Sequence, residues 1–281
     1  ISRKGDFMSF FSVDPEKCNQ DEICVKACPT NVIRLGSPGE VLEPIPEFEA
    51  YCLTCGHCVA VCPTEAFSLS WLSPEKCPPV RKEISLSQEQ AEQFLRSRRS
   101  IRNFKDTMVE RQKLEKLLEI SCYAPSARNS QPWHWTVIEN PTDVRRLAGM
   151  VIDWMRSVIK KDPKQAAQRG MVRVVSAWDA GEERICRGAP HVIVVHSDKD
   201  YGFGAEDGAL ALSYFELFAP TLGLGSCWGG YFYSAVNAYP PLFEALGLPA
   251  DHRAYGAVMV GYAELKYQRL PLRNEPRVSW K

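Results

Sequence analysis

Two cysteine-rich stretches in the first quarter of the chain have the residue types and the spacing of metal-ligand sites. The second reads Cys52-x2-Cys55-x2-Cys58-x3-Cys62-Pro63. Three thiolates on one tight loop can reach three corners of an iron–sulfur cubane, while the fourth cysteine starts a helix and points toward another cluster. Proline suits the next position, because a first helical turn needs no amide hydrogen there. Zinc sites use separate C-x2-C pairs, so this spacing predicts iron–sulfur chemistry.

The first stretch has the same spacing with one substitution. It reads Cys18-Asn-Gln-Asp21-Glu-Ile-Cys24-Val-Lys-Ala-Cys28-Pro29, with Asp21 at the second ligand position. A carboxylate is a harder and weaker ligand for cluster iron than a thiolate. Two outcomes stay open: a [4Fe–4S] cluster with Asp21 or solvent on one iron, or a [3Fe–4S] cluster with that corner empty. Cys77 is a conceivable substitute ligand, but its distance in sequence favours a free thiol.

Together the two stretches resemble the two-cluster bacterial ferredoxins. Each ends in Cys-Pro-Thr, and such an internal repeat implies a pseudo-symmetric module. The cross-ligation of these ferredoxins implies one cluster on Cys18, Cys24 and Cys62, with Asp21 possible, and another on Cys28, Cys52, Cys55 and Cys58. His57 is expected to be an exposed side chain rather than a ligand. The segment 36–46 between the halves is rich in Gly and Pro and predicts a hairpin or loop.

A third stretch with chemical potential is Arg98-Arg99-Ser100-Ile101-Arg102. In an extended chain, alternate side chains project to one side. Two guanidinium forks with a hydroxyl between them suit a phosphate group. The competing interpretation is a solvated basic helix end. A nucleic-acid patch is disfavoured, because the charges are few and the chain is neutral overall.

Two loops could surround a flat ligand. Residues 124–133 (APSARNSQPW) place hydrogen-bonding side chains between two prolines, and Ser126, Arg128 and Asn129 could match the polar edge of a flavin. An ordinary loop capped by a core tryptophan is the alternative. Residues 222–230 (LGLGSCWGG) are small enough to let backbone approach a ring closely. The nearest dinucleotide-type motif, Gly202-x-Gly204-x3-Gly208, has its third glycine one residue late and is a weak match.

The elements that must position these residues divide the chain. We predict a two-cluster module over residues 1–72, a Pro-containing linker over 73–87 and a larger domain over 88–281. Capping boxes at Ser87/Gln90 and Thr107/Glu110 predict two helix starts, the second before an apolar face of Leu114, Leu117 and Leu118. Further along, strands are predicted at 135–138, 191–196 and 254–262, and a centrally buried helix at 205–222. The predicted fold class is α+β.

Composition narrows the setting. The formal net charge is zero, which gives no indication of nucleic acid or an anionic membrane as partner. No apolar run is long enough to span a bilayer, and the N-terminus lacks the apolar stretch of a secretion signal. Eight of the eleven cysteines precede residue 80, a distribution typical of metal ligands rather than of a disulfide scaffold. The cytoplasm is the expected location.

Taken in order, the Arg98–Arg102 stretch, the 124–133 loop, the 222–230 loop and the Gly261-Tyr262…Arg269-Leu-Pro tail resemble the nitroreductase family of FMN oxidoreductases, and specifically members with an N-terminal ferredoxin-like module. The resemblance covers about residues 88–281. It implies a mixed sheet surrounded by helices, in an intertwined homodimer with the active site at the interface.

The resemblance also implies which residues bind FMN. Arg98, Ser100, Arg102 and Arg269 would hold the phosphate, Ser126 and Asn129 would reach the flavin from the neighbouring subunit, and backbone at Gly229 and Gly230 would lie beside flavin N5. The full expected set is Arg98, Arg99, Ser100, Arg102, Pro125, Ser126, Asn129, Cys227, Trp228, Gly229, Gly230 and Arg269. Tyr267 departs from a common Lys-x-Arg form, which leaves the shares of Lys266 and Arg273 open.

The functional hypothesis is an oxidoreductase. Electrons from a low-potential donor such as a ferredoxin would pass through two clusters to FMN and on to a small acceptor of the nitroaromatic or quinone type, with the cofactors performing the chemistry. No catalytic acid or base is expected. The alternative is an electron-transfer or redox-sensing subunit that serves a protein partner without turning over a small molecule. A third possibility, zinc-binding structural elements, would give a colourless protein.

Overall fold

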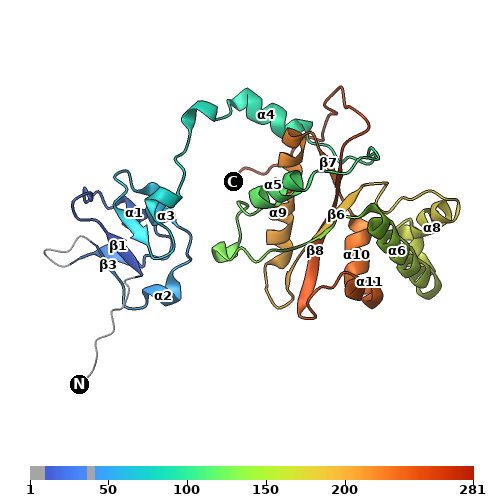
Figure 1. Cartoon of the computed structure of the whole chain (residues 1–281), viewed down its shortest axis with the longest axis horizontal. Helices are drawn as coiled ribbons and strands as arrows, with labels where there is room; N and C mark the ends of the chain where they lie inside the picture. Colours follow the sequence, from blue (N-terminus) through green and yellow to red (C-terminus); the bar gives the residue numbers. More distant parts are fainter. Residues whose placement is uncertain (1–9, 37–41) are drawn as a thin grey trace, which may run out of the picture. The chain divides into compact units, whose positions relative to one another are not determined.

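The computed structural model of the protein describes residues 10–36 and 42–281. The first nine residues and residues 37–41 of the predicted hairpin or loop at 36–46 therefore lie outside the described residues. The chain divides into two compact units, shown in Figure 1. One consists of residues up to 85 together with 128–130, and the other of 86–127 and 131–281.

The first unit is built from very short elements. Strand β1 (Phe11–Val13) pairs antiparallel with β4 (Phe67–Leu69), and β2 (Ile33–Leu35) pairs antiparallel with β3 (Leu42–Pro44). The helices are α1 (Ile23–Ala27), α2 (Phe48–Tyr51) and α3 (His57–Val61). Rings of Phe11, Phe48 and Phe67 pack in the small core, with centroids 4.9–5.2 Å apart. A core of this size gives limited stability on its own, so bound groups would add to it.

The sequence repeat is also a repeat of backbone conformation. Left-handed residues precede the two equivalent helices at Glu22 (φ 59°) and Gly56 (φ 72°). The same pairing recurs at Gln20 and Thr54, and again at Asn31 and Glu65, all with positive φ. Non-glycine residues seldom adopt this conformation. Its recurrence at matching positions shows that both halves wrap their loops in the same way.

The segment after β4 contains two single 3-10 turns, Pro74–Lys76 and Lys82–Ile84, and clusters with the first unit. Helix α4 (Gln88–Ser97) follows. Its capping box is confirmed: the Ser87 hydroxyl accepts from the Gln90 amide at 3.2 Å, and the Gln90 side chain accepts from the Ser87 amide at 2.9 Å.

The second unit contains a four-stranded sheet of order β5-β6-β8-β7. Its strands are β5 (His134–Ile138), β6 (His191–Asp198), β7 (Gly225–Trp228) and β8 (His252–Gly261), so the predicted strands are present. All three strand pairs are antiparallel. A mixed sheet, with parallel and antiparallel neighbours, was expected. The parallel pairing seen in this sheet is an isolated bridge between Ser100 and Ser226 at the edge strand β7.

Helices cover both faces of this sheet, as Figure 1 shows. Helices α5 (Arg111–Ser121) and α9 (Gly204–Phe218) lie on one face; α6 (Pro141–Lys161), α8 (Met171–Asp179) and α10 (Gly230–Ala238) lie on the other, with the short α7 (Pro163–Gln168) and α11 (Pro240–Ala245). Successive residues of the fully buried β6 alternate between the two cores, with Ile193 on the α9 side and Val194 on the α6 side.

Two predictions about helices were wrong in detail. Thr107 does not cap α5, which begins at Arg111 after an extended Glu110 that makes no capping bond. The apolar helix at 205–222 is not buried all round: α9 ends at Phe218 and a 3-10 turn follows. Leu210 and Tyr214 on α9 stay 41% and 38% exposed in the single chain. Within the described residues, no helix combines the length and apolar character needed to cross a bilayer.

Candidate functional site

Four ligand-type side chains surround a cavity at one end of the first unit. Cys18, Asp21 and Cys24 come from the first repeat, and Cys62 comes from the second. The empty volume between them and neighbouring residues is about 390 Å³. One carboxylate oxygen of Asp21 accepts a hydrogen bond from the Ile23 amide at 3.1 Å, which holds the local backbone turn. The structure therefore brings together the four residues expected around the first cluster.

A second cavity has the same arrangement, but here the second repeat supplies three cysteines and the first repeat supplies one. Cys52, Cys55 and Cys58 of the second repeat line it together with Cys28 of the first, around an empty volume of about 330 Å³. Each repeat thus sends its last cysteine to the other cavity. Cys28 and Cys62 are the residues at which the short helices α1 and α3 end. The expectation that this cysteine starts a helix, with proline in the first turn, was therefore wrong, because the chain after each Cys-Pro forms a turn.

The two donor sets of the first unit line open spaces rather than converging on one point. Four thiolates at a zinc–sulfur distance of about 2.3 Å would converge within about 4 Å of one another. In the part of the chain that the structure describes, no group of three or more His, Cys, Asp or Glu side chains converges in this way.

Burial disfavours the charged thiolate form of several of these cysteines. Desolvation raises the pKa of Cys58 to about 12, with repulsion from Cys55 adding to it. The same burial raises the pKa of Cys24. At Cys28 and Cys62 burial also acts upward, but hydrogen bonds from backbone amides and from the Thr30 and Thr64 hydroxyls outweigh it and lower each pKa. Cationic iron would stabilise all of these groups as thiolates.

Two further side chains of the first unit, Cys77 and His57, carry possible metal-binding atoms but are not among the eight predicted ligands. Cys77 lines neither cavity and packs partly buried against the apolar core. His57 is among the residues that line the second cavity, but its side chain is exposed and its Nδ1 lies 3.4 Å from the Cys55 carbonyl oxygen. Neither residue therefore replaces one of the eight predicted ligands.

In the second unit, the Arg98–Arg102 stretch runs along the sheet edge beside β7. The Ile101 amide donates to the Ser226 carbonyl at 2.9 Å, and Phe104 bridges to Ala263 further along. Gly225 permits this approach, because a Cβ there would lie 2.5 Å from the Ile101 side chain. The stretch is therefore held by backbone contacts that leave its arginines free to reach cavities.

The structure does not bring Arg98 and Arg102 to one cavity. Arg98 and Arg99 line a space of about 1060 Å³ with the tail residues 270–276, including Arg273. Arg99 Nε is buried there without a hydrogen-bond partner. Arg102 lines a different pocket. Arg269, expected beside Arg98, precedes the tail residues that line the first space and is exposed.

A buried carboxylate that sequence reasoning missed lies behind Arg98. Glu216 on α9 is 8% exposed, and its Oε1 lies 3.6 Å from Arg98 Nη1. Desolvation raises its pKa, although Arg98 and a hydrogen bond with the Trp228 side chain act in the opposite direction. The usable sequence signal was a single glutamate within the apolar second half of this predicted helix. Glu216 links the Arg98 stretch to the Trp228 loop.

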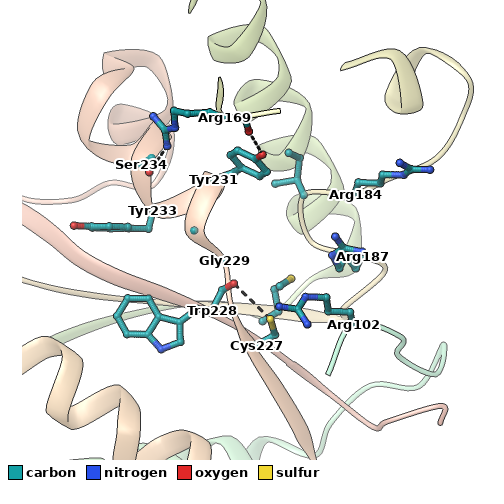
Figure 2. Close-up of a pocket in the computed structure, with 13 residues that line it drawn as sticks. Arg102, Arg169, Arg184, Arg187, Cys227, Trp228, Gly229, Tyr231, Tyr233 and Ser234 are labelled. Atoms are coloured by element: carbon teal, nitrogen blue, oxygen red, sulfur yellow. Dashed lines mark hydrogen bonds between the residues drawn. The ribbon is translucent and has the colours of Figure 1, made fainter. Parts of the chain in front are cut away.

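The pocket that contains Arg102 is drawn in Figure 2. Its empty volume is about 1010 Å³, and Trp228, Gly229 and Gly230 form part of its wall. The Gly229 amide donates to the Ala257 carbonyl at 2.8 Å. Gly230 begins α10, so its amide lacks a partner within the helix. A Cβ on Gly230 would meet nothing within 4 Å, which shows open space beside this backbone.

Sequence comparison decides the family of this second unit. The profile of the Nitroreductase family matches residues 95–262, more than half of the chain, and a 4Fe-4S dicluster domain profile matches residues 16–67. The chain belongs to the Nitroreductase family. It carries the dicluster domain at its N-terminal side.

Relatives and solved structures agree with this placement. The chain is 28% identical over 179 residues to a candidate NADH dehydrogenase/NAD(P)H nitroreductase of Archaeoglobus fulgidus, covering 62% of this chain and 86% of that protein. It is 26% identical to an iodotyrosine deiodinase of Thermotoga neapolitana, covering 66% and 94%. The fold matches a Bacteroides fragilis nitroreductase with bound FMN at a TM-score of 0.56 and 24% identity, covering 68% of this chain and 99% of that one.

The nitroreductase domain holds its 124–133 loop through a buried aspartate. Asp207, 2% exposed on α9, accepts from the Ala127 amide at 3.1 Å, and its carbonyl accepts from the Trp133 indole at 3.0 Å. The Ser126 hydroxyl accepts from the Gln131 amide at 3.0 Å. Asn129 has positive φ, as do its neighbours Arg128 and Gln131, so the loop stores backbone strain typical of ligand-binding segments. Neither Ser126 nor Asn129 lines the pocket of Figure 2.

Several residues of the nitroreductase pocket were missed from sequence. Arg169, Arg184 and Arg187 line it, as do Tyr231 and Tyr233. They come from the segments before β6 and from α10, neither of which contains a recognisable binding motif. Only the adjacency of Tyr231 and Tyr233 to the glycines of the 222–230 loop was a usable signal.

Proposed function

We propose that the protein is an iron–sulfur flavoprotein oxidoreductase that passes electrons from a low-potential donor through two clusters to FMN and then to a small acceptor. The observation that supports this most directly is the presence, in one chain, of two cysteine-lined cavities and a nitroreductase-family pocket. Clusters exchange single electrons, whereas a flavin supplies two-electron or hydride chemistry.

The linings of the two cavities support the following assignment of cluster ligands. We assign one [4Fe–4S] cluster to Cys28, Cys52, Cys55 and Cys58. The other cluster, [4Fe–4S] or [3Fe–4S], takes Cys18, Cys24 and Cys62, with Asp21 at the fourth corner. A carboxylate there makes this corner the weaker one.

The two arginine-containing cavities suggest how FMN would bind. In this structure Arg98 and Arg102 line different cavities, so we do not assign one phosphate to both. We assign the phosphate to Arg98 and Arg99, with Arg273 from the tail, where the unpartnered Arg99 Nε offers a donor. Arg102 and the backbone at Gly229 and Gly230 would contact the flavin ring instead.

The pocket can position an acceptor, and the groups on its described wall that could exchange a proton are the Tyr231 and Tyr233 hydroxyls and the Cys227 thiol. Among the described residues that line it, none is Asp, Glu or His. Reduction of a quinone to a hydroquinone takes two electrons and two protons, and reduction of a nitro group to a nitroso group takes the same with release of one water. Solvent would provide these protons, because the pocket is open and its arginines stay protonated.

We further propose that the active unit is a homodimer. Leu210 and Tyr214 leave an apolar strip of α9 exposed in the single chain, and Met108 and Tyr123 are exposed apolar side chains of the same unit. Exposed apolar area of this kind marks an interaction surface. In such a dimer Ser126 and Asn129 would approach the flavin of the partner. Light scattering on the anaerobic protein tests this, and a monomer would count against it.

The decisive measurement is anaerobic quantification of iron, acid-labile sulfide and released flavin on the purified protein. We expect one FMN per chain and seven or eight irons, the range set by the open choice at the Asp21 corner. Arg98→Ala combined with Arg99→Ala should release FMN on gel filtration. Arg253→Ala, an exposed arginine on β8 outside both cavities, is the matched control. Full flavin retention in the double variant would contradict the phosphate assignment.

Turnover separates the enzyme from an electron-transfer subunit. Reduced ferredoxin and NAD(P)H are compared as donors, with quinone and nitroaromatic acceptors. Faster turnover with ferredoxin is expected, because low-potential clusters accept electrons most readily from a donor at a similar potential. A flavin-loaded protein that turns over none of the acceptors would instead favour a protein partner.

A further inference from the structure

The pocket of Figure 2 contains more positive charge than the flavin contacts proposed above would use. Four arginines line it: Arg102, Arg169, Arg184 and Arg187. Arg184 is paired with the Glu182 carboxylate. In the described part of the chain no carboxylate oxygen lies within 4 Å of the guanidinium groups of the other three. With one arginine assigned to the flavin, two unpaired guanidinium groups remain.

Arg187 is held at the Cys227 end of this pocket. Both Arg102 and Arg187 lie close enough to lower the pKa of the Cys227 thiol, which burial otherwise raises. Figure 2 shows the two guanidinium groups on the same side of the pocket. Two like charges with no counter-ion repel each other. A site that keeps them together is complementary to an anion.

The loop that carries Arg187 is fixed by a neighbouring carboxylate. Glu183 accepts hydrogen bonds from the amides of Ile185, Cys186 and Gly188, at 2.6, 2.7 and 3.0 Å. Arg187 itself has φ 57°, a conformation that a non-glycine residue seldom adopts. A loop so constrained presents its arginine with little further loss of entropy on binding.

The opposite side of the pocket combines a second guanidinium group with aromatic rings. Arg169 donates to the Ser234 hydroxyl at 3.0 Å and stacks over the Trp154 ring at 5.5 Å. The Tyr231 hydroxyl donates to the Arg169 carbonyl, which ties this residue to α10. Tyr231, Tyr233 and Trp228 supply flat apolar surface. This combination of flat apolar surface with a few charged groups is typical of a small-molecule site.

We infer that the acceptor is a planar aromatic or quinoid molecule bearing a carboxylate or phosphate group, with Arg187 as the principal contact of that anion and Arg169 as a second one. This inference rests on the proposed function and deepens it by naming the substrate class. Arginine forks bind such groups through two parallel hydrogen bonds. The pyrophosphate of a nicotinamide dinucleotide has the same anionic chemistry, so the test must separate the two sources.

The test uses a matched pair of acceptors, 4-nitrobenzoate and its methyl ester, with reduced ferredoxin as donor. Because the ester is the more electron-poor, each variant is compared with wild type rather than one acceptor with the other. Arg187→Ala should raise the KM for 4-nitrobenzoate about tenfold relative to that for the ester, as expected for one charge-assisted bond partly open to solvent. Arg187→Lys, which keeps the charge without the fork, should show a smaller increase.

The control variant is Arg173→Ala, an exposed arginine on α8 outside the pocket lining. It should leave the ratio of the two KM values unchanged. Equal KM changes for acid and ester in Arg187→Ala would overturn the inference. So would a raised KM for NADH with an unchanged acid-to-ester ratio, which would assign the arginines to the dinucleotide, or loss of the dimer, which would assign them to an interface.

Failure of the underlying function would look different. If purified protein lacks flavin, or wild type reduces neither acceptor, the proposed function fails and the substrate class is moot. If wild type carries FMN and reduces both acceptors, but Arg187→Ala and Arg169→Ala leave the KM ratio of wild type, only the substrate inference fails.

Discussion

The two cysteine-lined cavities of the first unit share one backbone and differ in one donor. Their helices, left-handed residues and Thr-bonded cysteines correspond position by position, but Asp21 stands where the other cavity has Cys55. The repeat therefore gives both cavities the same backbone frame. In the assignment proposed above, a single side chain would set how firmly the fourth iron is held. Comparing the halves separates geometry from ligand chemistry inside one small unit.

The largest expected effect tests whether each repeat supplies a ligand to the other cavity. Cys28→Ser should remove the same cluster as Cys55→Ser, because both residues line the second cavity. Cys62→Ser should instead resemble Cys24→Ser. Iron analysis with EPR of the reduced protein distinguishes the two classes. If Cys28→Ser resembled Cys24→Ser, each repeat would bind its own cluster and the assignment would be wrong.

The next effect tests the difference at the fourth corner. In wild type, brief exposure to air should release about one iron per chain from the Asp21 half, because carboxylate is the weaker iron ligand. Asp21→Cys should slow this loss about tenfold or prevent it, and Cys55→Asp should create a second labile iron. Time-resolved iron release with a chromogenic chelator measures all three. Equal loss rates in wild type and Asp21→Cys would show that the carboxylate does not limit iron retention.

A smaller effect compares the left-handed residues before α1 and α3. Gly56→Ala should lower the stability of the first unit by about 1–2 kcal/mol, since φ is 72° and the new Cβ would lie 2.8 Å from Leu72 Cδ2. Glu22→Gly at the equivalent position should change stability by about 1 kcal/mol or less, because relief of strain is offset by chain entropy. The guanidinium midpoint of cluster bleaching reports both. Similar midpoints for the two variants would remove the argument from backbone strain.

The smallest effect concerns the cysteine outside both halves. Cys77→Ser should leave iron and sulfide content unchanged, because Cys77 lines neither cavity. Its partly buried position predicts only a slight loss of stability. The same analysis on Cys62→Ser supplies the positive control. Loss of iron from Cys77→Ser would place this thiol at the Asp21 corner and would end the comparison as stated.

Sequence reasoning succeeded where the chemistry depends on local spacing and was incomplete where it depends on the sheet. The capping box at Ser87 and Gln90 formed as predicted, because both partners lie within one helical turn. The equivalent signal at Thr107 failed, since tertiary contacts fix the chain there: the Val109 amide donates to His191 Nε2 at 3.0 Å. Likewise, the alternation of Arg98 and Arg102 did not predict that they line different cavities.

By itself, the sequence determined the two cysteine stretches, their internal repeat and the family of the larger unit, because those features are written in neighbouring residues. Only the tertiary structure decided that Glu183 fixes Arg187 at a pocket shared with Arg102 and Tyr231. It alone placed Glu216 behind Arg98. The physical reason is that charges far apart in the chain interact through their separation in space, and the order of the strands sets that separation.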